Sequence, residues 1–221
     1  MHIKRSIWFI AATLLLALDV GWVVSAWCDE TPATMRKVSV RVVEPEPAPG
    51  SFEEQPKVTW RAGNRYARVA EVPDPKGRIH GLIIINEPDV WSINLYNQSV
   101  KHLVDPGPSF NVHLPVFRPG DSIAGLKELE LGRELSFFRK NHAARSQGGV
   151  IRSAATERYK MSAGAATVIL WINVESKAPV RISLIHGGQI ITLEYLAYED
   201  LPFDASLFQP PPGIRENSDR R

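Results

Sequence analysis

Residues 167–214 read TVILWINVESKAPVRISLIHGGQIITLEYLAYEDLPFDASLFQPPPGI, and they carry the clearest strand pattern in the chain. This stretch contains three apolar segments. Turn-forming residues at 174–179 and at Gly187-Gly188 separate these segments from one another. Connections this short join antiparallel strands, because a parallel crossover needs a dozen or more residues. The stretch therefore predicts neighbouring antiparallel strands followed by a proline-rich tail.

The upstream part of the chain repeats this pattern at close intervals. Strand-like segments occur at 37–43, 58–61, 65–72, 78–85, 90–96, 100–104 and 156–161. Turn signals such as Gly63-Asn64 separate neighbouring segments, which favours an antiparallel meander over βαβ units. The expected fold class is mainly β (α+β), with one antiparallel sheet.

The period of two within each strand indicates that one side of the sheet is apolar. Trp91, Ile93 and Leu95 share a face that Ser92 and Asn94 do not share. The same alternation groups Leu170 with Ile172, and Ile182 with Leu184. An apolar sheet face needs a cover, and residues 122–141 are the best helical candidate for it after the N-terminus.

Charged residues on this predicted helix favour a structural role. Glu128, Glu130 and Glu134 alternate with lysines and arginines, which is typical of a solvated charged face. Gly132 is expected to break the helix into two pieces. We expect a loop or hairpin over residues 141–155.

Composition and motifs give no indication of a catalytic, metal-binding or nucleic-acid-binding function. The formal net charge is +2 with no basic run, which argues against nucleic acid as a partner. The six histidines are scattered and Cys28 is the only cysteine, so we expect no metal site and no cofactor. With no catalytic residue evident, we predict that the protein is not an enzyme. A hydrolase assembled from distant residues is a distant alternative.

The N-terminus predicts export. Residues 1–26 combine a basic start, an apolar run over 7–18 and Val24-Ser25-Ala26 before the expected cleavage point. We expect a Sec-type signal peptide, a periplasmic protein and no stable membrane span once the signal is cleaved. The alternative is an inner-membrane anchor made by an uncleaved signal. Lipidation at Cys28 is disfavoured by the bulk of the preceding Trp27.

Four parts follow along the chain. The signal peptide is 1–26, and 27–56 is a loose segment with one strand and a proline-rich loop. The main domain is 57–214, and 215–221 is a polar tail. Phe203, Leu207 and Phe208 are expected to pin the end of the chain to the sheet, with a partner-binding motif as the alternative.

The order of these segments resembles the LolA-like superfamily, which includes the periplasmic carrier of outer-membrane lipoproteins. The resemblance rests on 58–66, 89–95, 170–173, 176–180 and 201–213, with the Gly187-Gly188 hairpin, and it covers 57–214. Residues 126–155 have no counterpart in the carrier, so the chain resembles an uncharacterised branch. The resemblance implies a strongly curved antiparallel sheet, an incomplete β-barrel, with helices covering its concave face.

The resemblance also implies an apolar cavity that takes a lipid or lipoprotein acyl chain. The candidates that we expect to line it are Trp60, Tyr66, Trp91, Ile93, Leu95, Leu170, Ile172, Ile182 and Leu184. The expected function is a non-catalytic carrier or sensor, with an envelope protein as a further partner. The alternative is a protein-interaction or structural module in which the same side chains fill the core. The aromatic candidates taken singly favour core positions.

Overall fold

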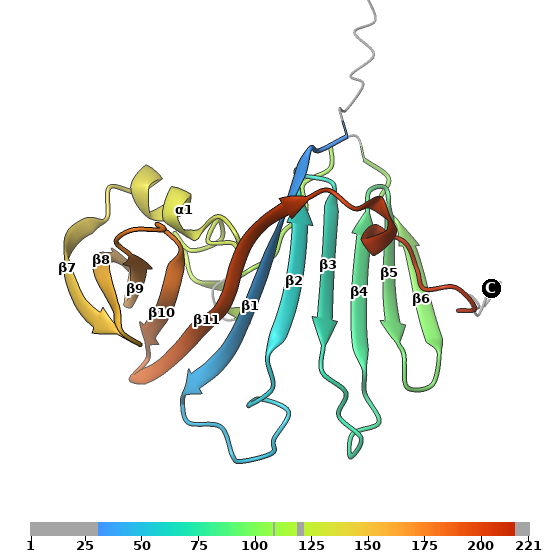
Figure 1. Ribbon diagram of the computed structural model, residues 1–221, viewed down its shortest axis with the longest axis horizontal. Helices are drawn as coiled ribbons and strands as arrows, with labels where there is room; N and C mark the ends of the chain where they lie inside the picture. Colours follow the sequence, from blue (N-terminus) through green and yellow to red (C-terminus); the bar gives the residue numbers. More distant parts are fainter. Residues whose placement is uncertain (1–30, 108, 119–121, 215–221) are drawn as a thin grey trace, which may run out of the picture. The chain divides into compact units, whose positions relative to one another are not determined.

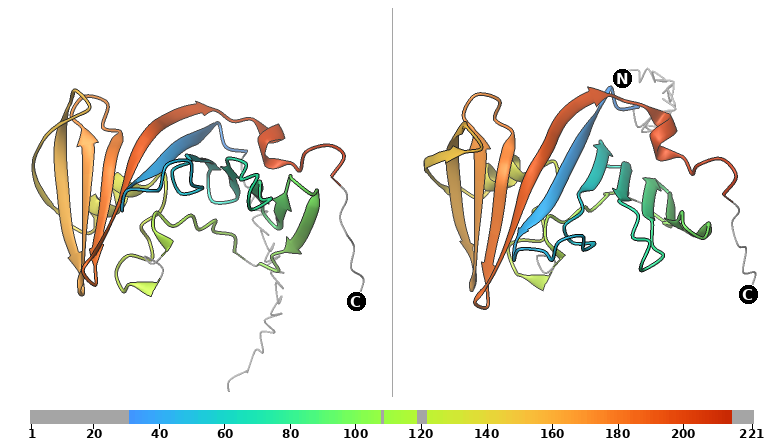
Figure 2. Two further views of the ribbon diagram at one scale, coloured as in Figure 1. Left: turned by 90° about the horizontal axis from the view of Figure 1, so that it is seen from below. Right: turned by 60° about the horizontal axis from the view of Figure 1, so that its bottom comes forward.

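One antiparallel sheet of 11 strands, in the order β6-β5-β4-β3-β2-β1-β11-β10-β9-β8-β7, dominates the computed structural model (Figure 1). The structure describes residues 31–107, 109–118 and 122–214. From Pro32 onward these residues belong to one compact unit. Within it the sheet curves and leaves its two long sides unjoined, as expected for the fold class (Figure 2).

The first half of the sheet is a meander. Its strands are β1 (Thr34–Glu44), β2 (Lys57–Ala62), β3 (Tyr66–Glu71), β4 (Gly81–Asn86), β5 (Asp89–Asn94) and β6 (Ser99–Val104). Each pairs with the next, and tight turns join most of them. The first of these strands was expected within the loose segment 27–56. The structure places it in the middle of the sheet.

The second half returns from the opposite edge. Its strands are β7 (Ala144–Ile151), β8 (Ala154–Ala163), β9 (Ala166–Asn173), β10 (Pro179–His186) and β11 (Gln189–Pro202). The expected turns over 174–178 and at Gly187-Gly188 join the last three strands. Residues 141–155, expected as a loop or a hairpin, form the hairpin of β7 and β8.

A single connection carries the chain from one edge of the sheet to the other. We call residues 105–143 the crossing segment; it includes helix α1 (Glu134–Lys140). It lies inside the curve of the sheet, on the face that we call concave (Figure 2). The predicted helix over 122–141 is therefore only partly correct, since helix forms only over the last 7-residue stretch. Gly132 precedes it at φ +83°, where a Cβ would come within 3.4 Å of Arg36 Cδ.

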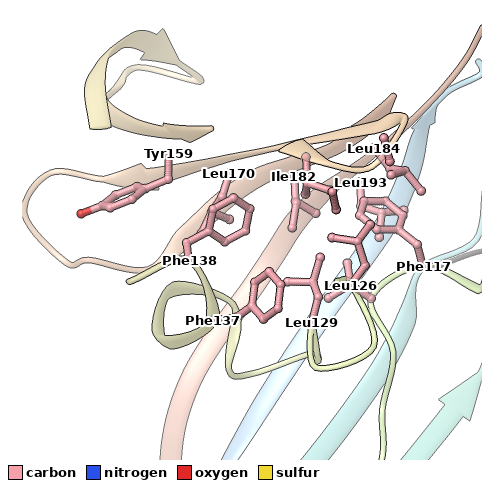
Figure 3. Packing of buried hydrophobic residues seen from close by; sticks show 14 of the residues in the cluster. Phe117, Leu126, Leu129, Phe137, Phe138, Tyr159, Leu170, Ile182, Leu184 and Leu193 are labelled. Atoms are coloured by element: carbon pink, nitrogen blue, oxygen red, sulfur yellow. The ribbon is translucent and has the colours of Figure 1, made fainter. Parts of the chain in front are cut away.

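The main core fills the concave side of the second half (Figure 3). Phe137 and Phe138 from α1, with Leu126 and Leu129 before it, pack against β8–β11. Phe138 is 0% exposed, and so are Leu170 and Ile182 on the facing strands. The crossing segment thus supplies the cover that the apolar face requires.

The C-terminal tail covers part of the opposite, convex face. Phe203 and Phe208 stack with ring centroids 5.5 Å apart, and Tyr66 lies edge-on to both. Asp204 is the N-cap of the 3₁₀ helix η2 (Ala205–Phe208), and its side chain accepts a hydrogen bond from Ser206 N. The prediction that the tail residues pin the end of the chain to the sheet is confirmed.

The expected signal peptide at 1–26, Cys28 and the polar tail at 215–221 lie outside the described residues. In the part of the chain that is described, no helix has the length and apolar character needed to cross a membrane.

Phe138→Ala should lower the free energy of unfolding by about 3–5 kcal/mol, because it removes a fully buried ring and leaves a cavity. Leu103→Ala is the control, since Leu103 is 52% exposed. It should cost less than about 1 kcal/mol. Urea denaturation of both variants measures the difference. Equal losses would show that α1 does not hold the core.

Candidate functional site

The nine predicted ligand-binding residues lie on two faces of the sheet. Leu170, Ile172, Ile182 and Leu184 belong to the concave core, and each is at most 1% exposed. Trp60, Tyr66, Trp91, Ile93 and Leu95 lie on the convex face with the C-terminal tail. The expectation that the two groups share one face is therefore wrong.

The error has a simple physical origin. Alternation correctly groups residues within a strand, but it does not say which face a group occupies relative to a distant strand. That relation is carried across the sheet by register, through pairs such as Lys37 with Trp60 and Ile84 with Trp91. No local pattern in the sequence encodes it.

A second apolar surface lies on the concave face of β3–β6. It comprises Val69, Ile83, Ile85, Val90 and Leu103, which we call the open apolar face. Register pairs connect its members: Val69 with Ile83, Ile85 with Val90, and Val90 with Leu103. Val69 and Ile85 also pack against the buried cluster that Ala67 forms with Val112 and Leu114 of the crossing segment, which establishes the side.

The crossing segment covers this surface incompletely. Ile83 is 43% exposed and Leu103 is 52% exposed. Ser92 and Lys101, which follow Ile83 in the same cross-strand row, form a polar border. The concave side therefore has a filled half over β8–β11 and an open apolar half over β3–β6.

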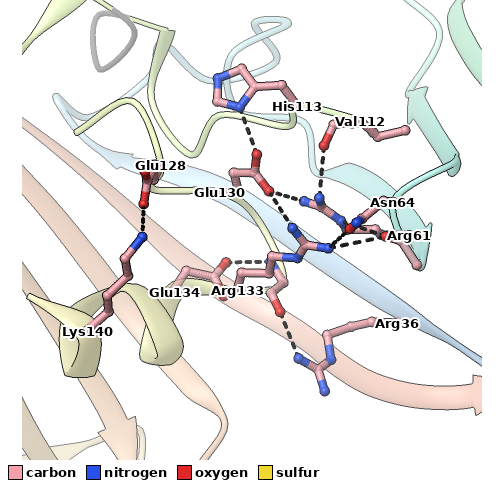
Figure 4. Close-up of polar contacts among 12 residues, drawn as sticks. Arg36, Arg61, Asn64, Val112, His113, Glu128, Glu130, Arg133, Glu134 and Lys140 are labelled. Atoms are coloured by element: carbon pink, nitrogen blue, oxygen red, sulfur yellow. Dashed lines mark hydrogen bonds and ion pairs between the residues drawn. The ribbon is translucent and has the colours of Figure 1, made fainter. Parts of the chain in front are cut away.

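A buried ion pair fixes the crossing segment between these halves (Figure 4). The Arg61 guanidinium donates to the Glu130 carboxylate and to Val112 O, and both charged residues are 6% exposed. His113 Nδ1 lies 2.8 Å from Glu130 Oε1. Burial lowers the pKa of Arg61 from its ordinary value, and the charge of Glu130 opposes that shift.

A second polar group anchors the start of α1. The Glu134 side chain is 0% exposed and accepts hydrogen bonds from Gly132 N, Tyr195 Oη and Tyr198 Oη at 2.9, 2.9 and 3.2 Å. Burial raises the pKa of Glu134, although these hydrogen bonds oppose the shift. Burial likewise raises the pKa of Tyr195 well above its ordinary value.

The interpretation of Glu130 and Glu134 as solvated is wrong, whereas Glu128 is exposed and pairs with Lys140 at 2.6 Å. The buried carboxylates find partners far away in the chain: Arg61 is 69 residues from Glu130, and Tyr195 is 61 residues from Glu134. The sequence did contain one sign that this stretch is not helical. Residues 128–131 read Glu-Leu-Glu-Leu, and such alternation is typical of extended backbone. In the structure Glu130 forms an isolated antiparallel β-bridge with Pro115.

No protein-family model matches the chain, and no curated protein matches it. Solved structures do. An uncharacterized conserved protein from Thermus thermophilus is 12% identical, with 83% of this chain and 90% of that one covered at a TM-score of 0.46. Lipoprotein LppX from Mycobacterium tuberculosis is 11% identical, with 80% of this chain and 91% of that one covered at a TM-score of 0.42. A LolA superfamily protein from Nitrosomonas europaea is 12% identical, with 82% of this chain and 91% of that one covered at a TM-score of 0.33.

Replacing Glu134 should change how stability depends on pH. Because the folded state raises the pKa of Glu134 above its ordinary 4.5, the folded protein binds this proton more tightly than the unfolded chain. Its contribution is fully present below the ordinary pKa and is lost as pH rises through the raised one. Glu134→Gln should therefore lose less stability than the wild type between about pH 5 and pH 8.

Urea denaturation at both pH values measures this slope. Glu128→Gln makes the same chemical change at an exposed position of the crossing segment and should keep the wild-type slope. Parallel curves for the wild type and Glu134→Gln would contradict the assignment.

Proposed function

We propose that the protein binds an acyl chain of a lipid or lipoprotein on the open apolar face and acts as a non-catalytic carrier or sensor. The observation that carries this proposal is the incomplete cover of β3–β6, where Ile83 and Leu103 remain 43% and 52% exposed. An apolar ligand on this face would complete a burial that the crossing segment leaves unfinished.

The energetics suit an alkyl chain. Each methylene removed from water contributes about 0.8 kcal/mol, so a chain with eight contacting methylenes would gain about 6 kcal/mol before the costs of ordering. The open apolar face extends over three strand spacings, about 14 Å. It presents branched aliphatic side chains and needs no directional polar partner.

The binding surface is smaller than the cavity that the sequence suggested. Leu170, Ile172, Ile182 and Leu184 are already covered by the crossing segment, so they support the fold and do not contact the proposed ligand. Trp60, Tyr66, Trp91, Ile93 and Leu95 lie beneath the C-terminal tail. The proposed ligand contacts are therefore Val69, Ile83, Ile85, Val90 and Leu103.

A protein-interaction module is the second candidate. The filled concave core favours it, because side chains of the protein itself pack over β8–β11. In that case an apolar surface of an envelope protein would cover the open apolar face. Export to the periplasm through residues 1–26 is part of both proposals.

Ile83→Asp should abolish binding of a fluorescent fatty-acid probe, because a carboxylate on the open apolar face must be desolvated by an alkyl chain. The matched control is Ile190→Asp. Ile190 is 40% exposed and pairs with Ile185 on the convex face. It should bind the probe like the wild type.

Fluorescence titration gives the dissociation constants, and circular dichroism confirms that both variants fold. No probe binding by the wild type, together with no lipid extracted from protein purified from cell envelopes, would contradict the acyl-chain proposal. It would leave the interaction module as the better account.

A further inference from the structure

A cavity of about 310 Å³ lies beside helix α1, at residues that the proposed acyl-chain site does not use. Three parts of the chain enclose it: α1 with the residues just before it, the turn between β9 and β10, and the paired ends of β1 and β11. The lining residues are Arg36, Gly132, Arg133, Leu135, Ser136, Arg139, Ser176, Lys177, Ala178, Tyr198 and Asp200.

The lining is strongly cationic. Four basic side chains, Arg36, Arg133, Arg139 and Lys177, face one carboxylate, Asp200. Ser136 and Ser176 also line the cavity, and a serine hydroxyl can donate a hydrogen bond. Solvated lysines and arginines ordinarily spread over a surface, whereas here they converge on one hollow from three separate segments.

Two of the cations are held in place. Arg36 donates to both carboxylate oxygens of Asp200 at 2.8 Å, and its other nitrogen donates to Gly132 O at 2.7 Å. Arg133 donates to Asn64 Oδ1 at 2.5 Å. Their positions are therefore set before any ligand arrives, which lowers the entropic cost of binding.

The other two cations are more available. Arg139 is exposed at the end of α1, and its side chain makes no hydrogen bond or ion pair with the residues that the structure describes. Lys177 Nζ lies 3.3 Å from Glu157 Oε1, and the Lys177 side chain is 46% exposed. Glu157 already receives Arg145 at 2.6 Å, so Lys177 can turn toward a new anion without leaving that carboxylate unpaired.

We propose that this cavity is an anion site that takes a phosphate group, with Arg139 and Lys177 as the main contacts. Guanidinium groups match phosphate oxygens in pairs, and an ammonium adds a compact charge. The volume accommodates a small phosphomonoester or the head group of a phospholipid.

Calorimetry with sn-glycerol 3-phosphate tests the site directly. The wild type should bind it, and the affinity should fall as salt increases. The double variant Arg139→Gln/Lys177→Gln should bind about tenfold more weakly or worse, because two charge-assisted hydrogen bonds are lost. The matched double variant Lys76→Gln/Lys160→Gln removes the same charge at exposed positions elsewhere and should bind like the wild type.

Vesicle flotation distinguishes the sources of the phosphate. Retention on phosphatidylglycerol vesicles but not on phosphatidylcholine vesicles, lost in the Arg139/Lys177 double variant, would assign a lipid head group. Binding of glycerol phosphate without vesicle retention would assign a soluble phosphomonoester.

The proposal would be overturned if the wild type bound neither glycerol phosphate nor phosphatidylglycerol vesicles. It would also be overturned if the two double variants lost affinity equally. The Ile83→Asp variant should keep its affinity for glycerol phosphate. The anion site and the acyl-chain site therefore stand or fall separately.

Discussion

The pairing of the first strand with the last one is the constraint on which the rest of the structure depends. β1 and β11 pair along ten residue positions, from Thr34 with Pro202 to Glu44 with Thr192. Because these two strands meet in the middle, the meanders on either side grow outward, and β6 and β7 become the two edges. The connection between them must then pass over a face of the sheet. The crossing segment is the direct result.

This geometry divides the concave face. The crossing segment is long enough to fill the side of β8–β11 with Phe137, Phe138 and their neighbours, but it leaves β3–β6 incompletely covered. The two buried carboxylates, Glu130 and Glu134, hold it through Arg61, Tyr195 and Tyr198. Losing one partner of such a buried pair costs about 3–5 kcal/mol, so the polar contacts oppose any displacement of the segment. The proposed ligand binding on the open half would therefore require no rearrangement of the core.

Local patterns in the sequence predicted the strands, the turns and the pinned tail, because a period of two and turn residues are local properties. They did not predict the relative face of Trp91 and Leu170, since that depends on pairing between strands distant in the chain. Glu130 and Glu134 were missed for the same reason: Arg61 and Tyr195, which bind these carboxylates in the interior, lie more than sixty residues away in the chain. The open apolar face was missed because Ile83 and Leu103 have the same residue types as buried positions. They are exposed only because the crossing segment does not cover them, and the sequence pattern of their strands does not show this.

A nuclear Overhauser measurement between a carbon-13-labelled fatty acid and the methyl groups of the protein would locate the bound alkyl chain. If the alkyl chain lies on the open apolar face, it should show contacts to Ile83, Val90 and Leu103. Leu170 and Ile182, which the crossing segment covers, should show none. Contacts to these core methyls, or to Ile185 and Ile190 on the convex face, would contradict this placement.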